Sequence, residues 1–467
     1  MTSRREFIRM LGTGATSLIA GRTLSGATGA EPSVPRGPNF VFILIDDLGW
    51  TDLGFMGSRY YETPRIDALA SESVVFKQAY SNAPNCAPTR ACLMSGQYGP
   101  RHGIYTVGTP ERGRAERRKL IPTPNATELG TEHVTIAEAL KPAGYACACI
   151  GKWHLGSKTP HRPQDRGFDV VYDRSRRGHY AEDGQYLTDR LTDESVRFIK
   201  AYRDKPFFLY LSHHAVHTPI QAKAELTAKY ERKTPVGEHR NPRYAAMIES
   251  VDQSVGRVLD ALNELKLAQN TVVFFFSDNG GYANATSIDP LRGSKGMLYE
   301  GGIRVPAIVR WPGVTRAGRV CDVPIIGIDF YPTILEMAHA PRPTGHTLDG
   351  ESLVPLLTEK ADLKRDAIFW HFPAYLEPYN DRQWPWRITP AAAIRQGDWK
   401  LIEFFEDGRL ELYNVRDDIS ETTNLTDTEP ARAKMLHAKL LAWRQRVNAP
   451  VPTQLNPQFD SAALKRP

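Results

Sequence analysis

The chain has 467 residues, more than one hydrophobic core usually holds, so we expect two domains. Its formal net charge is +6, but residues 1–30 hold four arginines and one glutamate and so account for three of these charges. The remaining balance excludes a nucleic-acid-binding surface as the main function, and no nucleic acid is expected as a partner. Five cysteines are too few for a disulfide-stapled scaffold.

The first thirty residues have the pattern of an export signal. Residues 3–9, Ser-Arg-Arg-Glu-Phe-Ile-Arg, resemble a twin-arginine motif, and a weakly apolar stretch and small residues at 27–30 follow. We predict a twin-arginine signal peptide over 1–30, the twin-arginine translocase as a partner, and a periplasmic or secreted bacterial protein; the alternative is an ordinary basic N-terminus. No stretch is long and apolar enough to predict a membrane span.

Two apolar runs end in carboxylates. Residues 39–45 read Asn-Phe-Val-Phe-Ile-Leu-Ile and are followed by Asp46 and Asp47, and residues 271–276 are followed by Ser277, Asp278 and Asn279. Such runs are typical of buried parallel strands, whose carboxyl ends face the ligand crevice of an α/β sheet. Carboxylates and an amide oxygen suit calcium or magnesium better than zinc. A bound cation also accounts for burying so many acids together.

The segment after the first strand carries a cysteine motif. Residues 86–90 read Cys-Ala-Pro-Thr-Arg, and the run to Met94 with Pro88 in its first turn predicts a helix that begins near Pro88. Arg90 would then lie one turn beyond Cys86. Further along, a strand predicted at 145–150 is followed by Gly151-Lys152-Trp153-His154, where Lys152 can hold an anion and His154 can move a proton.

Three histidines follow another strand-like run, residues 207–211, as Ser-His-His-Ala-Val-His-Thr-Pro. A zinc site built from His213, His214 and His217 is one interpretation, although carboxylate-rich surroundings favour another. A glycine-rich segment over 291–306 then places Lys295 in a bend where the backbone can approach an anion closely.

These five segments, in this order, resemble those of the formylglycine-dependent type I sulfatases, the group that includes arylsulfatase A and N-acetylgalactosamine-6-sulfatase. The likeness covers roughly residues 38–350. It implies that a formylglycine-generating maturation enzyme oxidises Cys86 to formylglycine, and that one calcium ion is bound. The implied calcium ligands are Asp46, Asp47, residue 86, Asp278 and Asn279. The implied catalytic residues are Cys86, Arg90, Lys152, His154, His217 and Lys295.

The resemblance also implies a reaction. A hydroxyl of the hydrated aldehyde attacks sulfur with assistance from Asp278, while Lys152, Lys295 and His217 stabilise charge on the sulfate and the leaving oxygen. His154 then accepts a proton as the sulfate is expelled. One expected polar sulfate contact has no match in residues 170–179.

The same likeness implies an alkaline-phosphatase-like α/β fold. Its mostly parallel sheet is sandwiched by helices, in agreement with the alternation of apolar runs and helical patterns such as residues 244–262. We predict a catalytic domain over 36–360 and a C-terminal α+β subdomain with its tail over 361–467. Short strands near 367–370, 391–395, 399–405 and 409–415, followed by a helix over 435–443, predict a small antiparallel sheet there.

The predicted function is hydrolysis of a sulfuric ester, in a sulfated carbohydrate rather than a small aryl sulfate. Two alternatives stay open. A formylglycine phosphodiesterase or phosphonate monoester hydrolase of the same fold meets similar geometric demands. An exported glycan-binding protein without activity would result if Cys86 were never converted. The sulfate position and exo or endo action are left open by these patterns.

Overall fold

A computed structural model describes residues 37–173, 178–379 and 384–465. The predicted signal peptide, residues 1–30, lies outside the described residues. Contacts join residues 37–467 into one unit, so the predicted boundary at residue 360 stays a prediction. In the part of the chain that is described, no helix is long and apolar enough to cross a membrane.

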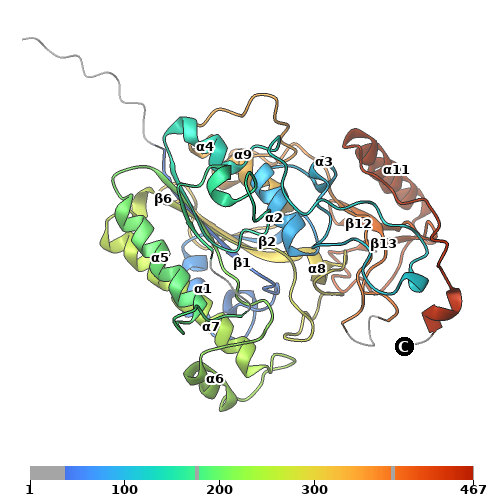
Figure 1. The fold of residues 1–467 in the computed structure, drawn as a ribbon, viewed down its shortest axis with the longest axis horizontal. Helices are drawn as coiled ribbons and strands as arrows, with labels where there is room; N and C mark the ends of the chain where they lie inside the picture. Colours follow the sequence, from blue (N-terminus) through green and yellow to red (C-terminus); the bar gives the residue numbers. More distant parts are fainter. Residues whose placement is uncertain (1–36, 174–177, 380–383, 466–467) are drawn as a thin grey trace, which may run out of the picture. The chain divides into compact units, whose positions relative to one another are not determined.

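A nine-stranded sheet forms the centre of the molecule (Figure 1). Its eight-strand path is β4 (Val170–Tyr172), β3 (Ala146–Gly151), β5 (Phe207–Ser212), β1 (Asn39–Ile45), β6 (Thr271–Ser277), β7 (Arg304–Arg310), β2 (Val74–Tyr80) and β8 (Arg319–Cys321), with β9 (Ile325–Ile326) paired to β2. The strands pair in parallel, except that β7 is antiparallel to both of its neighbours. The predicted mostly parallel sheet is therefore confirmed.

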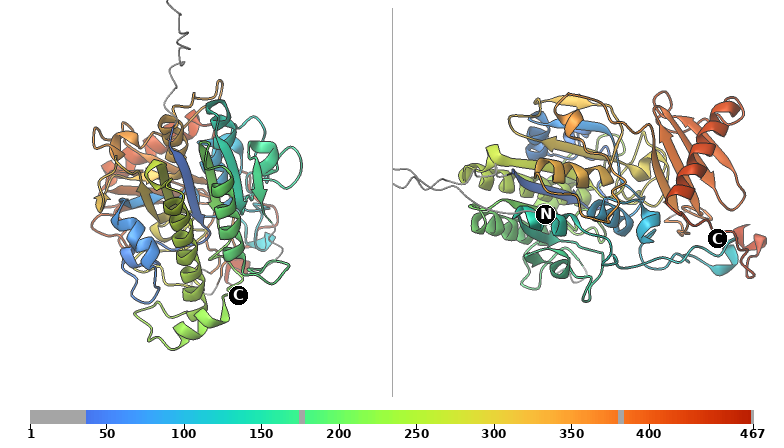
Figure 2. Two further views of the ribbon diagram at one scale, coloured as in Figure 1. Left: turned by 90° about the vertical axis from the view of Figure 1, so that its left-hand side faces the viewer. Right: turned by 90° about the horizontal axis from the view of Figure 1, so that it is seen from above.

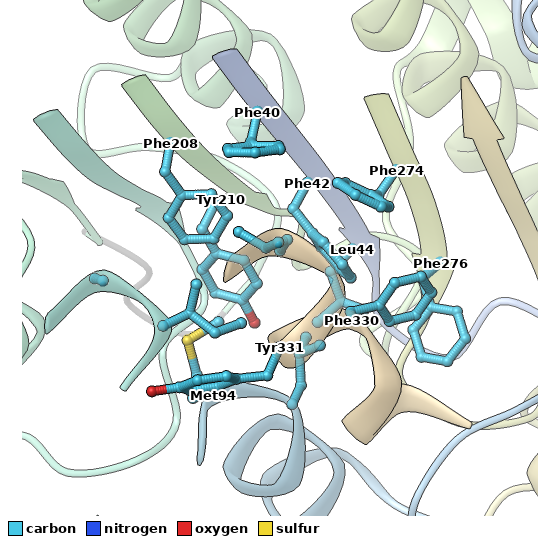
Figure 3. Packing of buried hydrophobic residues seen from close by; sticks show 14 of the residues in the cluster. Phe40, Phe42, Leu44, Met94, Phe208, Tyr210, Phe274, Phe276, Phe330 and Tyr331 are labelled. Carbon is cyan, nitrogen blue, oxygen red and sulfur yellow. The ribbon is translucent and has the colours of Figure 1, made fainter. Parts of the chain in front are cut away.

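Alternate residues of β1 pack on opposite faces of this sheet. Phe40, Phe42 and Leu44 enter one buried cluster, and Val41 and Ile43 enter the other. This is the side-chain alternation of a strand that is buried on both sides. Figure 3 shows the first cluster, where the rings from β1, β5 and β6 meet Met94, Phe330 and Tyr331.

Helices cover both faces, as the sequence predicts. One face packs against α1 (Pro64–Ser71), α5 (Leu187–Ala201) and α7 (Pro242–Glu264), and α6 (Ala224–Glu231) contacts α7. The other face packs against α2 (Cys86–Ser95), α4 (Ile136–Leu140), α9 (Phe330–Met337) and α10 (Val354–Leu357). Short helices α3 (Gly99–His102) and α8 (Glu300–Ile303) lie in the connections.

The C-terminal region folds as the predicted antiparallel sheet with one packed helix. The strands β10 (Ile368–Phe372), β11 (Ala391–Gln396), β12 (Trp399–Phe404) and β13 (Leu410–Asn414) pair in that order. The helix α11 (Pro430–Arg446) contacts β11 and β12, and the helix and the sheet are seen together in the right-hand view of Figure 2. Buried side chains of this sheet and of α11, including Trp370 of β10 and Trp443 of α11, belong to a third hydrophobic cluster.

A buried histidine of β10 predicts acid sensitivity of the fold. His371 donates from Nε2 to the Pro450 carbonyl at 2.8 Å, and burial lowers its pKa from 6.5 to about 3. The unfolded chain therefore binds one more proton than the folded chain between these values, so stability is lost as the pH falls below about 6.5. His371→Phe should flatten this loss by about 1.4 kcal/mol per pH unit.

Urea unfolding at several values between pH 7 and pH 4.5 measures this slope. His339→Asn is a matched control, because His339 is exposed and has a positive φ of 51° that asparagine tolerates. An unchanged slope in His371→Phe would contradict the assignment of this proton to His371.

Candidate active site

The candidate site lies where four adjacent parallel strands end. In the register of the sheet, Ile45 of β1 pairs with Ser277 of β6, and Ser212 of β5 pairs with Gly151 of β3. The residues that follow these strands are the acids, histidines and lysine singled out in the sequence. Because neighbouring parallel strands stop at the same edge, segments more than 200 residues apart in the chain meet there.

Cys86 is brought to this edge by α2. It is the first residue of the helix, 2% exposed, and follows the extended residue Asn85. Its sulfur and carboxylate oxygens of Asp46 and Asp278 all lie within 4.8 Å of one another. The amino end of a helix carries partial positive charge, which favours a negatively charged group near this position.

Arg90 connects the helix α2 to the acids. Its Nε and Nη2 donate to Asp278 Oδ2 at 3.0 and 2.7 Å, and Nη2 lies 3.5 Å from Asp46 Oδ2. Its Nη1 donates to the Lys152 carbonyl at 2.8 Å and to the Ser212 hydroxyl. Burial lowers the pKa of Arg90, but the two carboxylates outweigh burial and raise it, so the side chain stays charged.

Two lysines point at the acidic cluster from opposite segments. Lys152 pairs with Asp46 Oδ2, and Lys295 Nζ lies 2.7 Å from the Asp47 carboxylate. Burial opposes their charge, yet the neighbouring carboxylates raise the pKa of both ammonium groups above the ordinary value. Cys86 contributes to both shifts, so both ammonium groups lie within electrostatic reach of that residue.

The two catalytic-candidate histidines differ in environment. Burial, together with the charges of Lys152 and Arg90, lowers the pKa of His154 to about 3, so its ring is neutral. His217 donates from Nδ1 to the Thr218 carbonyl at 2.6 Å, and its Nε2 lies 3.8 Å from Asp47 Oδ2. Hence His217 alone of the three-histidine segment faces the acids.

The other two histidines support the site. His213 is buried with Nε2 3.1 Å from the Ser254 hydroxyl, and His214 Nε2 lies 3.5 Å from Asp173. Neither shares a cluster of possible metal ligands with the other histidines within the described residues. The zinc interpretation of the three histidines is therefore unsupported.

The acidic cluster fits a hard divalent cation. Burial raises the pKa of Asp278, and the charge of Asp46 raises it further. Burial would also raise the pKa of Asp46, but the charges of Lys152, His217 and Arg90 outweigh burial and lower it. Among the described residues, Asp46 Oδ1 and Asn279 Oδ1 are buried without a hydrogen-bond partner. Asp47 adopts a positive φ of 64°, and its Oδ1 accepts a 2.8 Å hydrogen bond from Asn279 Nδ2. Unpartnered oxygens beside carboxylates are the donors that calcium prefers.

Several residues around the site had no sequence signal. His179, inside the segment without a family match, donates from Nε2 to the His217 carbonyl at 2.7 Å. The Tyr244 hydroxyl of α7 donates to Asp52 Oδ2 at 2.7 Å and lies 3.3 Å from the Asp47 carbonyl oxygen. Tyr244 stood out in the sequence only as an apolar position of the helix, because spacing cannot reveal which hydroxyl meets a distant turn.

Comparison with known proteins agrees with this arrangement. The sulfatase family model matches residues 38–340, and the model of the C-terminal region of N-sulphoglucosamine sulphohydrolase matches residues 294–446. The chain belongs to the sulfatase family, the hydrolases of sulfuric esters, as its motifs predict.

Individual relatives place it among characterised members. It is 35% identical to a sulfatase of Formosa agariphila over 88% of this chain and 90% of that one. It is 32% identical to human N-acetylgalactosamine-6-sulfatase, with 77% and 73% of the two chains covered. The crystal structure of Ps i-CgsB in complex with k-i-k-neocarrahexaose matches with a TM-score of 0.76 at 29% identity, covering 92% of this chain and 96% of that chain.

Proposed function

We propose that this sulfatase releases inorganic sulfate from a sulfated carbohydrate, using formylglycine made from Cys86 and one calcium ion. The observation that carries the proposal is the convergence of Cys86, two lysines and His217 on one buried acidic cluster, with His154 within electrostatic reach of it. The proposed sugar substrate is supported by relatives named for an N-acetylgalactosamine sulfate and by a neighbour bound to a carrageenan oligosaccharide.

A bound calcium ion and a formylglycine at residue 86 would supply two functions. Calcium, held by Asp46, Asp47, Asp278 and Asn279 with residue 86, neutralises sulfate charge when bound. Formylglycine, when formed from Cys86, provides an oxygen nucleophile through its hydrate. The remaining work falls to side chains that the structure describes.

Lys152 and Lys295 bind the sulfate as a bidentate cationic clamp. Both ammonium groups stay protonated, because carboxylates raise their pKa values, and both lie within electrostatic reach of residue 86. Without a substrate they pair with Asp46 and Asp47 instead. Charge stabilisation in a buried site of this kind acts most strongly as negative charge develops in the transition state.

The protons are handled by the histidines. His217 Nε2 faces the cluster while its Nδ1–H is held by the Thr218 carbonyl, which orients the ring toward the leaving oxygen. His154 is neutral, and its buried Nδ1 has no hydrogen-bond partner among the described residues. That nitrogen can accept the proton of a hydroxyl at residue 86.

Sulfate release from defined substrates tests this function. Matured protein should release sulfate from at least one sulfated oligosaccharide in a glycosaminoglycan and carrageenan panel, and more slowly from an aryl sulfate. An aryl phosphodiester in the same panel is the competing substrate. Cleavage of the phosphodiester alone would overturn the proposal in favour of phosphoester hydrolysis.

We also propose that the protein is exported, in line with the twin-arginine pattern at residues 4 and 5. Export in the folded state lets a cytoplasmic maturation enzyme act on Cys86 beforehand. Fractionation of the native host should place the protein outside the cytoplasm, and Arg4→Lys with Arg5→Lys should retain it inside. Export of that double variant at the wild-type level would contradict this route.

A further inference from the structure

A large cavity borders the segment that carries Lys295. A cavity of about 1210 Å³ is walled on one side by Gly293, Ser294 and Tyr299, and on another by Trp386 and Arg387. A separate hollow of about 780 Å³ includes Lys152 and His154 themselves. Ser294 of the larger cavity directly precedes Lys295, so this cavity lies beside the segment that contributes Lys295 to the candidate active site.

Arg387 is the unusual residue of this wall. It is 7% exposed, and its only side-chain hydrogen bond to a described residue is a long one, 3.5 Å from Nη1 to the Lys295 carbonyl oxygen. Its Nε is buried without a partner there. No carboxylate of the described residues lies within 4.0 Å of its guanidinium group.

Several other arginines with little exposed surface are neutralised. Arg90 pairs with Asp278, Arg166 with Glu138, and Arg365 with Asp329. A buried charge without a partner is costly, so pairing is the rule for such side chains. Within the described part of the chain, Arg395 also lacks a carboxylate partner, but its Nε and Nη2 donate to the Gly397 carbonyl and to Gln78. Arg387 has only one long hydrogen bond to a described residue and lies beside a cavity large enough for a sugar.

The side chain is nevertheless held in one place. Its guanidinium group lies 3.5 Å from the centre of the Tyr379 ring, and a Cβ on Gly296 would approach its Nε to 2.8 Å. Burial lowers the pKa of Arg387 to about 10, which leaves it charged at neutral pH. The charge of Glu377, which pairs with Arg112, opposes this lowering most. The charge of Asp47 opposes it less, so Arg387 also lies within electrostatic reach of the acidic cluster.

We propose that Arg387 binds a second anionic group of the substrate, a carboxylate or a further sulfate, while the ester to be cleaved lies between Lys152 and Lys295. This inference rests on the proposed function. The fixed guanidinium group, with no carboxylate partner among the described residues, suits bidentate binding of such an anion. Trp386 in the same wall offers an apolar face to a sugar ring. The natural substrate is then a sugar with at least two negative groups.

Three probes separate the two kinds of anion. N-acetylgalactosamine 6-sulfate has one anion, its 4,6-disulfate adds a sulfate, and its disaccharide with glucuronate adds a carboxylate. Calorimetry with Cys86→Ala protein measures binding without turnover, and kcat/KM for sulfate release is measured with matured protein. At least one doubly charged probe should bind about 10- to 100-fold more tightly than the single sulfate.

Arg387→Met in both backgrounds should remove this preference and leave the single sulfate nearly unchanged. Arg409→Met is the matched control, because Arg409 lines the same cavity but is half exposed and paired with Glu411. Arg387→Lys should keep part of the preference. A wild-type protein without a preference would overturn the inference, as would equal weakening of all probes by Arg387→Met.

The proposed reaction and the proposed anion site at Arg387 can fail independently of each other. If no probe releases sulfate but Cys86→Ala protein still discriminates through Arg387, the anion site stands and the proposed reaction fails. If sulfate is released without discrimination, the reaction stands and the role of Arg387 fails. If no probe binds, the role of Arg387 is overturned, and the reaction is decided by the wider oligosaccharide panel.

Discussion

Cys86→Ala should reduce sulfate release by about 10⁴-fold or more, since alanine offers no oxygen or sulfur nucleophile. The folded structure should survive, because the helix α2 tolerates alanine at its first position and the Arg90 contacts to Asp278 remain. Thermal unfolding of the variant near the wild-type temperature, alongside lost turnover, separates a chemical effect from misfolding.

Cys92→Ala is the matched control. Cys92 lies on the same helix and is also buried, but its sulfur faces His102 Nε2 at 3.4 Å in the cluster beneath the C-terminal sheet. We expect Cys92→Ala to keep most of the activity with a stability loss of about 1 kcal/mol. Equal loss of activity in both variants would show that α2 needs its cysteines for packing, not chemistry.

Lys400→Met should have the largest effect on stability. The Lys400 ammonium group is fully buried between Glu300 and Glu421, at 3.0 and 2.9 Å from their oxygens. Glu300 also accepts from the Tyr80 hydroxyl at 2.7 Å, and its backbone N–H donates to Glu421 at 2.7 Å. Removing the cation leaves two buried carboxylates, and breaking such a pair costs about 3–5 kcal/mol.

This network joins β12 to the segment that carries Lys295. Glu300 begins α8, five residues beyond Lys295, whereas Lys400 belongs to the C-terminal sheet. Burial raises the pKa of Glu421 to about 7 although Lys400 opposes the rise, so without Lys400 this carboxyl group gains a proton still more readily in the folded state than in the unfolded state. The stability defect should therefore grow as the pH rises from about 5 to 8.

Urea unfolding of Lys400→Met and Lys439→Met gives the comparison. Lys439 also pairs with a carboxylate, Asp366, but both side chains are substantially exposed. Its replacement should cost less than about 1 kcal/mol. Similar losses in the two variants would contradict the special role of the buried network.

The sequence predicted the part of the site that follows strands. Apolar runs ending in Asp46 or Asp278 indicate both a strand and the acids at its end, so the place of these acids at the edge of the sheet could be predicted from the chain alone. In the region 39–310, β2 was missed, because exposed Lys77 and half-buried Gln78 break its apolar pattern. The reversed direction of β7 was also invisible, since strand direction depends on pairing and not on composition.

Residues that act through distant contacts escaped prediction for another reason. Lys400 reads as an ordinary strand lysine, yet folding places it with Glu300 and Glu421. Arg387 reads as part of a loop, and its lack of a carboxylate partner among the described residues becomes apparent only when its surroundings are known. Such roles depend on which side chains meet in space, which one sequence alone does not specify.

The most direct test of the account is the mass of the peptide that contains residue 86. In a preparation that releases sulfate, we expect a peptide in which the cysteine has lost sulfur and two hydrogens and gained one oxygen. The converted fraction should rise in proportion to specific activity across preparations. Full activity in protein whose Cys86 remains an unmodified thiol would contradict the central claim.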